Sequence, residues 1–70
     1  MNPDYCKRIK HCFSVAYKAL EKHDGAGAED FKAIHGEFVE LSRGDDLLMD
    51  LLVAVYGELA REHRKRSGGD

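Results

Sequence analysis

The side chains in this sequence that could ligate a metal ion are two cysteines and four histidines. A helix brings two ligands to one side when they are three or four residues apart, as in His-x-x-x-His. No two of these six residues have that spacing, and the sequence contains no C-x-x-C motif. We therefore expect no metal site and no cofactor within one chain. The six residues are Cys6, His11, Cys12, His23, His35 and His63.

Residues suited to nucleophilic catalysis are also poorly arranged. None of the three serines lies in a nucleophile-elbow pattern. His11 and Cys12 cannot form a dyad, because adjacent residues on a helix do not face each other. The aspartates at positions 45, 46 and 50 lack the glycine and glutamate spacing of a calcium loop, and no P-loop or dinucleotide-binding fingerprint is present. The sequence thus predicts a protein that is not an enzyme.

Three segments with a helical spacing of apolar residues must position any functional side chain, and none of the chain alternates with a period of two. We expect an all-α fold, a three-helix up-down-up bundle. It would form a single helical domain over residues 1–66, followed by a flexible tail over residues 67–70. The expected helices run over about residues 4–23, 28–43 and 46–66.

The ends of these helices carry recognisable signals. Gly25 and Gly27 interrupt the pattern after the first segment, and Gly44 follows the second. Asp45 or Asp46 then suits the N-cap of the third segment. On the first segment, the residues expected to face the core are Tyr5, Ile9, Cys12, Phe13, Ala16, Ala19 and Leu20. On the second segment they are Phe31, Ile34, His35, Phe38 and Leu41.

Two further expectations concern the middle of the second segment. His35 lies on the apolar side, where a core histidine is the simpler interpretation than a metal ligand. Gly36 interrupts the helix, and a glycine there costs about 1 kcal/mol relative to alanine. Close approach of another helix would explain this glycine, and plain tolerance would explain it equally well.

The composition is that of one small soluble domain. The chain has 70 residues, of which 43% are hydrophobic and 34% charged, with one proline and no tryptophan. This composition excludes a disordered chain, a collagen-like chain and a disulfide scaffold. A chain of this size buries only about 60% of its surface on folding, and small domains often gain stability by self-association.

The net charge of −2 hides three blocks of different sign. Residues 1–23 and 59–70 are basic, with net charges of +3 and +2, whereas residues 24–58 carry a net charge of −7. Packed helices can neutralise such blocks within one chain, and the same asymmetry can orient a partner. Neutralisation within the chain is the simpler of these two interpretations.

The cysteines and the apolar runs bear on localisation. If Cys6 and Cys12 share a helix, they point roughly 120° apart and lie about 9 Å apart along its axis, which excludes a disulfide between them. Reduced thiols fit a cytoplasmic protein. Residues 1–4 have no apolar signal core, and no apolar run approaches the ~20 residues needed to span a membrane. We therefore expect a cytoplasmic protein without a membrane partner.

The third helical segment has more apolar surface than two neighbouring helices can cover. Eleven of the fourteen residues 47–60 are apolar. Uncovered apolar surface marks interaction sites, and a second copy of the same chain is the commonest partner. We therefore expect a homodimer or a higher oligomer; the alternative is a compact monomer in which the third segment is the central helix. If the oligomer does not form through the third segment, we expect its interface on the first segment around Phe13 and Tyr17. The expected oligomer interface comprises Leu47, Leu51, Leu52, Val55, Tyr56 and Leu59.

The function most consistent with these observations is that of a small helical interaction protein. It would bind and occlude a macromolecular partner, in particular a protein, through one of two charged faces. In its size and lack of motifs the chain is similar to accessory proteins of phages and mobile elements, some of which inhibit host defence. The expected acidic face comprises Glu29, Glu37 and Glu40. The expected basic face comprises Lys7, Arg8, Lys10, Lys18 and Lys22.

Two alternatives remain open. The lysine row of the first segment could follow a phosphate backbone, which would make the chain a nucleic-acid accessory protein. The net charge of −2 disfavours this role, and the third segment is too apolar to lie in a major groove. The second alternative is an oligomeric nucleotide binder, in which Tyr5, Lys7 or Arg8 contacts an anionic nucleotide between subunits.

Overall fold

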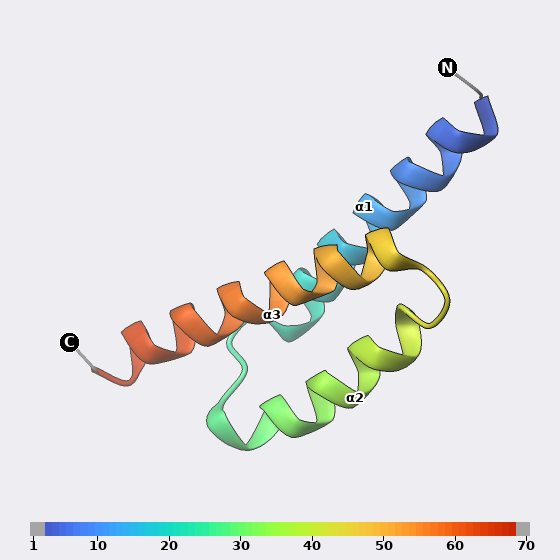
Figure 1. The fold of residues 1–70 in the computed structure, drawn as a ribbon. Helices are drawn as coiled ribbons and strands as arrows, with labels where there is room; N and C mark the ends of the chain where they lie inside the picture. The colour runs from blue at the N-terminus through green and yellow to red at the C-terminus, as the bar shows by residue number, and fades with distance from the viewer. Residues whose placement is uncertain (1–2, 69–70) are drawn as a thin grey trace.

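The computed structural model describes residues 3–68 and consists of three α-helices and one short 3-10 helix. Figure 1 shows α1 and α3 running in the same direction, with α2 returning in the opposite one. No strand occurs within the described residues. The expected all-α class with three helices is confirmed. The elements are α1 (Pro3–His23), η1 (Ala28–Asp30), α2 (Phe31–Leu41) and α3 (Asp46–Arg66).

The helix ends follow the sequence signals with one exception. Asp45 is the N-cap of α3, and its carboxylate accepts a hydrogen bond of 3.1 Å from the backbone N–H of Leu48. Gly44 precedes it at a φ of 78°, in the left-handed region that favours glycine. The second helix is shorter than expected, because its first residues form the 3-10 helix η1 and its last turn ends at Leu41. Of the expected tail, residues 69 and 70 lie outside the described residues.

The core lies mainly between α1 and α3, and α2 covers one side of it. The buried residues of α1 are all small, namely Cys12, Ala16 and Ala19. They lie at helical spacing on one side of the helix, so α3 can approach α1 closely there. The buried residues from α2 and α3 are larger: Ile34, Phe38, Leu48, Leu52 and Leu59.

The inward side of α1 was only partly predicted. Tyr5 and Phe13 were expected in the core, but both are more than half exposed. The seven apolar residues span a wider arc than one neighbouring helix can cover, and the small side chains on that arc allow the closest contact with α3. Tyr5 also lies in the first turns of α1, which project beyond the other helices in Figure 1.

Two residues of α2 that were expected to face the core, His35 and Leu41, are exposed instead. His35 is exposed, and its ring packs against the ring of Tyr56 with centroids 6.2 Å apart. Leu41 is also largely exposed, because it lies at the last residue of the shortened helix. Gly36 does not mark a close contact within the chain, since a Cβ built there would meet no other atom within 4 Å.

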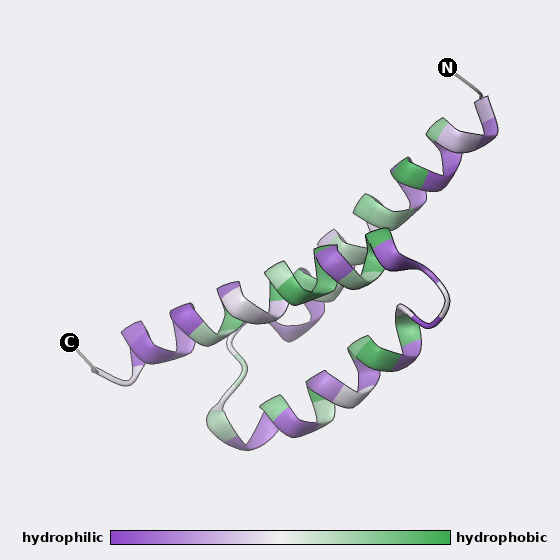
Figure 2. Ribbon diagram, in the orientation of Figure 1, coloured by the Kyte–Doolittle hydropathy of each residue, from purple (hydrophilic) through white to green (hydrophobic). Residues whose placement is uncertain are grey.

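The molecule is elongated for its size. Its principal extents are 46 × 20 × 16 Å, and its radius of gyration is 13.5 Å, whereas a compact domain of this length has a radius of gyration of about 11 Å. α1 and α3 overhang at opposite ends, as Figure 1 shows. In Figure 2 the last turns of α3 are largely hydrophilic, whereas its first half is largely hydrophobic.

Candidate functional site

One polar cluster joins α1 to the start of α3. The Arg8 guanidinium lies 2.8 Å from Oδ1 of Asp45, and the Cys12 thiol donates a hydrogen bond of 3.4 Å to Oδ2. The hydrogen bond from the backbone of Leu48 lowers the pKa of Asp45, with help from Cys12 and Arg8. Burial raises the pKa of the Cys12 thiol, and so does its hydrogen bond to Asp45. The thiol is therefore a donor that holds the fold together, not an activated nucleophile.

A second cluster joins the end of α1 to α2. The Glu37 carboxylate lies 2.9 Å from both Lys22 Nζ and His23 Nε2. The hydrogen bond with His23 is the main cause that lowers the pKa of Glu37, followed by the hydrogen bond from Lys22. The His23 ring also meets Phe38 edge-on, with centroids 5.8 Å apart. This cluster attaches α2 to α1.

The expected acidic face is not one continuous surface. Glu37 is directed towards α1 by the second cluster, and Glu40 forms an ion pair with Arg43. Glu29 lies on η1, away from both. Because two of the three carboxylates are neutralised within the chain, this set offers a partner little net negative charge.

The expected basic face is reduced to three lysines. Arg8 pairs with Asp45, and Lys22 pairs with Glu37. The other three side chains are exposed, and none forms an ion pair within residues 3–68. The three remaining lysines are Lys7, Lys10 and Lys18.

Two large aromatic residues lie beside these lysines on α1. Phe13 is 55% exposed and Tyr17 is 62% exposed. They are four residues apart, so they stack one turn above the other, and at ~100° per residue they border the lysines around the helix. Sequence reasoning placed Phe13 in the core. The available signal was that Phe13 and Tyr17 lie to one side of the small residues Cys12, Ala16 and Ala19. We define the α1 face as Lys7, Lys10, Phe13, Tyr17 and Lys18.

The residues expected at the oligomer interface mostly serve the core of the single chain. Leu52 is 1% exposed and Leu59 is 3% exposed, so the chain's own helices already cover them. The other four are partly buried and pack against that core: Leu47, Leu51, Val55 and Tyr56. The large apolar residues that α3 leaves exposed are Met49 and Val53.

Three open clefts surround α2. A cleft of about 230 Å³ between α2 and α3 is lined mainly by apolar side chains, among them Val39, Met49 and Val53. Clefts of about 410 Å³ and 360 Å³ lie between α1 and α2. None of these three clefts is lined by Tyr5, Lys7 or Arg8, the residues expected to contact a nucleotide between subunits.

Within residues 3–68, no group of three or more histidine, cysteine, aspartate or glutamate side chains is placed to hold a metal ion. No helix in the same range is long and apolar enough to cross a membrane. Comparison of the chain with protein-family models, with curated proteins and with solved structures found no match.

Proposed function

We propose that this protein is a non-enzymatic helical interaction protein that binds and occludes a macromolecular partner through the α1 face. The observation that carries this proposal is the exposure of Phe13 and Tyr17, at 55% and 62%, beside lysines that have no ion pair within the described chain. An aromatic side chain buries roughly 150–250 Å² when it is covered. Exposed aromatic residues beside charged side chains are typical of binding hot spots.

The charge of the α1 face indicates the chemistry of the partner. Lys7, Lys10 and Lys18 would favour a protein surface with acidic side chains around an apolar pocket, because complementary charge speeds association and selects partners. The ring of Phe13 would fill that pocket. The Tyr17 hydroxyl, on the same α1 face, would form a hydrogen bond at the rim of that pocket.

A single-stranded nucleic acid is the second candidate partner. Alternating cationic and aromatic side chains bind single strands, because the lysines contact phosphates while the bases stack on the rings. The α1 face has both components. The net charge of −2 weakens the long-range attraction of a polyanion, so we rank the acidic protein first.

The proposal includes a cytoplasmic location, where thiols stay reduced, because Cys6 and Cys12 are six residues apart on α1 and too distant to form a disulfide with each other. An inhibitor of host defence carried by a phage or mobile element would be one instance of such an occluding protein.

The test is to immobilise the protein and to measure how much of each partner it captures from a lysate of the cells in which it occurs. Two double variants are compared with wild type: Phe13→Ala/Tyr17→Ala, and Lys7→Glu/Lys10→Glu. A matched control, Val39→Ala, removes an exposed apolar side chain from α2 instead. We expect one partner to be captured by wild type and by the control, and lost from both α1 variants. Equal capture by all four proteins would refute the α1 face.

Nuclease treatment and an oligonucleotide separate the two candidates. If the partner is an acidic protein, capture survives nuclease, and wild type does not bind a single-stranded oligonucleotide at physiological salt. If the partner is nucleic acid, oligonucleotide affinity falls steeply with salt and is lost in the Lys7→Glu/Lys10→Glu variant.

A further inference from the structure

The side of α3 that faces away from the core carries a regular row of residues. At ~100° per residue, these residues follow one another at alternating intervals of four and three along the helix, the spacing of a coiled-coil seam. Their mean direction is about 140° around α3 from that of the buried residues Leu48, Leu52 and Leu59, and Val53 also borders the cleft between α2 and α3. We define the α3 seam as Asp46, Asp50, Val53, Gly57, Ala60 and Arg64.

The two ends of the α3 seam carry opposite charge. Asp46 and Asp50 at the start are exposed, as is Arg64 at the end, and none of the three forms an ion pair within residues 3–68. Eighteen residues separate Asp46 from Arg64, which is about 27 Å along the helix axis. These charges therefore cannot neutralise each other within one chain.

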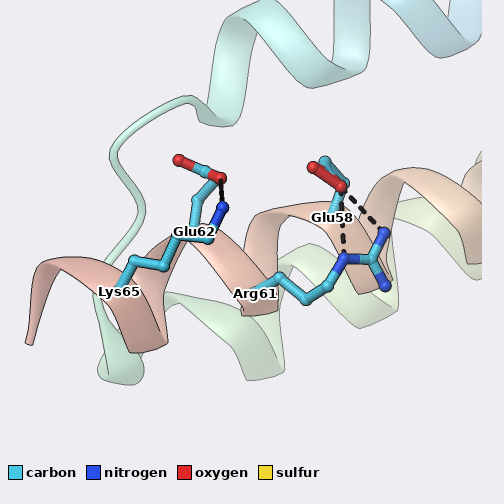
Figure 3. A network of polar contacts seen from close by, with 4 residues as sticks. All are labelled: Glu58, Arg61, Glu62 and Lys65. Carbon is cyan, nitrogen blue, oxygen red and sulfur yellow. Dashed lines mark hydrogen bonds and ion pairs between the residues drawn. The ribbon is translucent and has the colours of Figure 1, made fainter. Parts of the chain in front are cut away.

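The carboxylates near the basic end do not cancel its charge. Figure 3 shows Glu58 paired with Arg61, at 2.8 Å, and Glu62 paired with Lys65, at 3.3 Å. Both carboxylates are thus matched by cations on the next turn of the same helix. Arg64 adds an unmatched positive charge, so the end of the α3 seam is basic.

The middle of the α3 seam carries no charge and combines one exposed valine with a glycine. Val53 is 66% exposed, the most exposed large apolar residue in the described chain. One turn further on, a Cβ built on Gly57 would meet only the Arg61 guanidinium, at the ordinary contact distance of 3.6 Å. Packing within the chain therefore does not require a glycine at this position, although glycine weakens a helix. The missing side chain leaves room for another helix to approach closely.

We propose that the α3 seam pairs with the α3 seam of a second copy, with the two helices antiparallel about a two-fold axis near residue 55. In this register Asp46 lies opposite Arg64 of the second copy, and Val53 lies opposite Gly57 of the second copy. Asp50 lies opposite Ala60, next to Arg61. Both acidic ends then meet basic ends, and each valine fills the space left by a glycine. A parallel pairing would instead place aspartate against aspartate.

The exposed area of the chain is consistent with such a partner. The single chain exposes 5138 Å², against roughly 4,400 Å² expected for a compact protein of this mass. The excess of about 700 Å² belongs to the elongated molecule as a whole, and it is similar in size to the roughly 800 Å² that each partner buries in an interface of standard size. The proposal does not depend on the α1 face, which belongs to another helix, and a dimer would present two copies of that face.

Charge reversal tests the pairing by size-exclusion chromatography with light scattering. We expect wild type to have about twice the mass of 7.9 kDa. Two double variants make the seam charge uniform: Asp46→Arg/Asp50→Arg makes it basic, and Arg61→Glu/Arg64→Glu makes it acidic. Each should weaken self-association at least about a hundredfold, because like charges then face each other. An equimolar mixture of the two variants should recover the dimer mass.

Recovery in the mixture distinguishes lost pairing from lost folding, and circular dichroism of each variant confirms its helicity. The matched control is Lys7→Glu/Lys10→Glu, which changes the net charge by the same amount as Arg61→Glu/Arg64→Glu. The control should keep the dimer mass while it loses partner capture, so the two proposals fail separately. A monomeric wild type, dimeric variants, or a mixture that stays monomeric would each overturn the α3 pairing.

Discussion

The inward sides of α1 and α3 are built from opposite kinds of residue. α1 presents the small side chains of Cys12, Ala16 and Ala19 to the core, whereas α3 presents leucines, including Leu52. Large side chains from one helix pack onto a flat stripe on the other, so the two helices approach closely. The outward sides differ as well: α1 exposes the aromatic rings of Phe13 and Tyr17, whereas α3 exposes charged residues and aliphatic side chains such as that of Val53.

The buried residues of the two helices belong to the core, whereas the exposed aromatic residues of α1 contribute little to it. A chain of 70 residues has few large apolar side chains with which to build a core. Exposing Phe13 and Tyr17 while burying two alanines on the same helix makes poor use of apolar surface for folding alone. This comparison is the reason why we propose that the aromatic residues of α1 serve binding.

The largest expected effect on stability comes from the inward side of α3. Leu52→Ala removes a side chain that is 1% exposed, and it should lower the free energy of unfolding by about 2–5 kcal/mol. Its neighbour Val53 is 66% exposed, so Val53→Ala should change the stability of the monomer by less than about 0.5 kcal/mol. Urea unfolding at concentrations low enough to keep the chain monomeric measures both. Similar losses of unfolding free energy in the two variants would contradict the assignment of Leu52 to the inward side of α3 and of Val53 to its outward side.

A smaller loss is expected when the flat stripe of α1 is filled. Ala16 is buried between α1 and α3, and Ala16→Leu should cost about 1–3 kcal/mol because the added carbon atoms force the helices apart. The equivalent change on the outward side, Ser14→Leu, should have little effect on folding. A stabilising effect of Ala16→Leu in thermal unfolding would mean that the two helices are not in close contact at this point.

The sequence was sufficient for the helices but not for their contacts. Proline at position 3, the left-handed Gly44 and the Asp45 cap are local signals, so the ends of α1 and α3 could be predicted to within one residue. Which side of α1 faces α3 could not be predicted, because its seven apolar residues span a wide arc and several sides of the helix could face the core. The ion pair of Arg8 with Asp45 also escaped prediction, since it joins residues 37 positions apart. The α1 face could be recognised only once such pairs had removed Arg8 and Lys22 from the basic set.

The smallest effect is expected at the charged contact between α1 and α2. The pKa of Glu37 is lowered from 4.5 by His23 and Lys22. A carboxyl with a lowered pKa in the folded state stabilises the protein above its unfolded pKa, and this contribution is lost as the pH falls through the folded value. The melting temperature of the wild type should therefore decrease below about pH 4.5. The melting temperature of the Glu37→Gln variant should decrease less steeply over the same range, because the variant has no carboxylate at this position. Identical pH profiles for the two proteins would show that this ion pair does not hold α2.

The central claim is that Phe13 and Tyr17 serve a partner and not the fold, and the most direct test measures both properties of one variant. In Phe13→Ala/Tyr17→Ala, each substitution should change the free energy of unfolding by no more than about 0.5 kcal/mol, while capture of the partner is abolished. Urea unfolding and quantitative capture on the same preparation provide the two numbers. A loss of several kcal/mol in stability with capture retained would contradict the account, because the rings would then belong to the core.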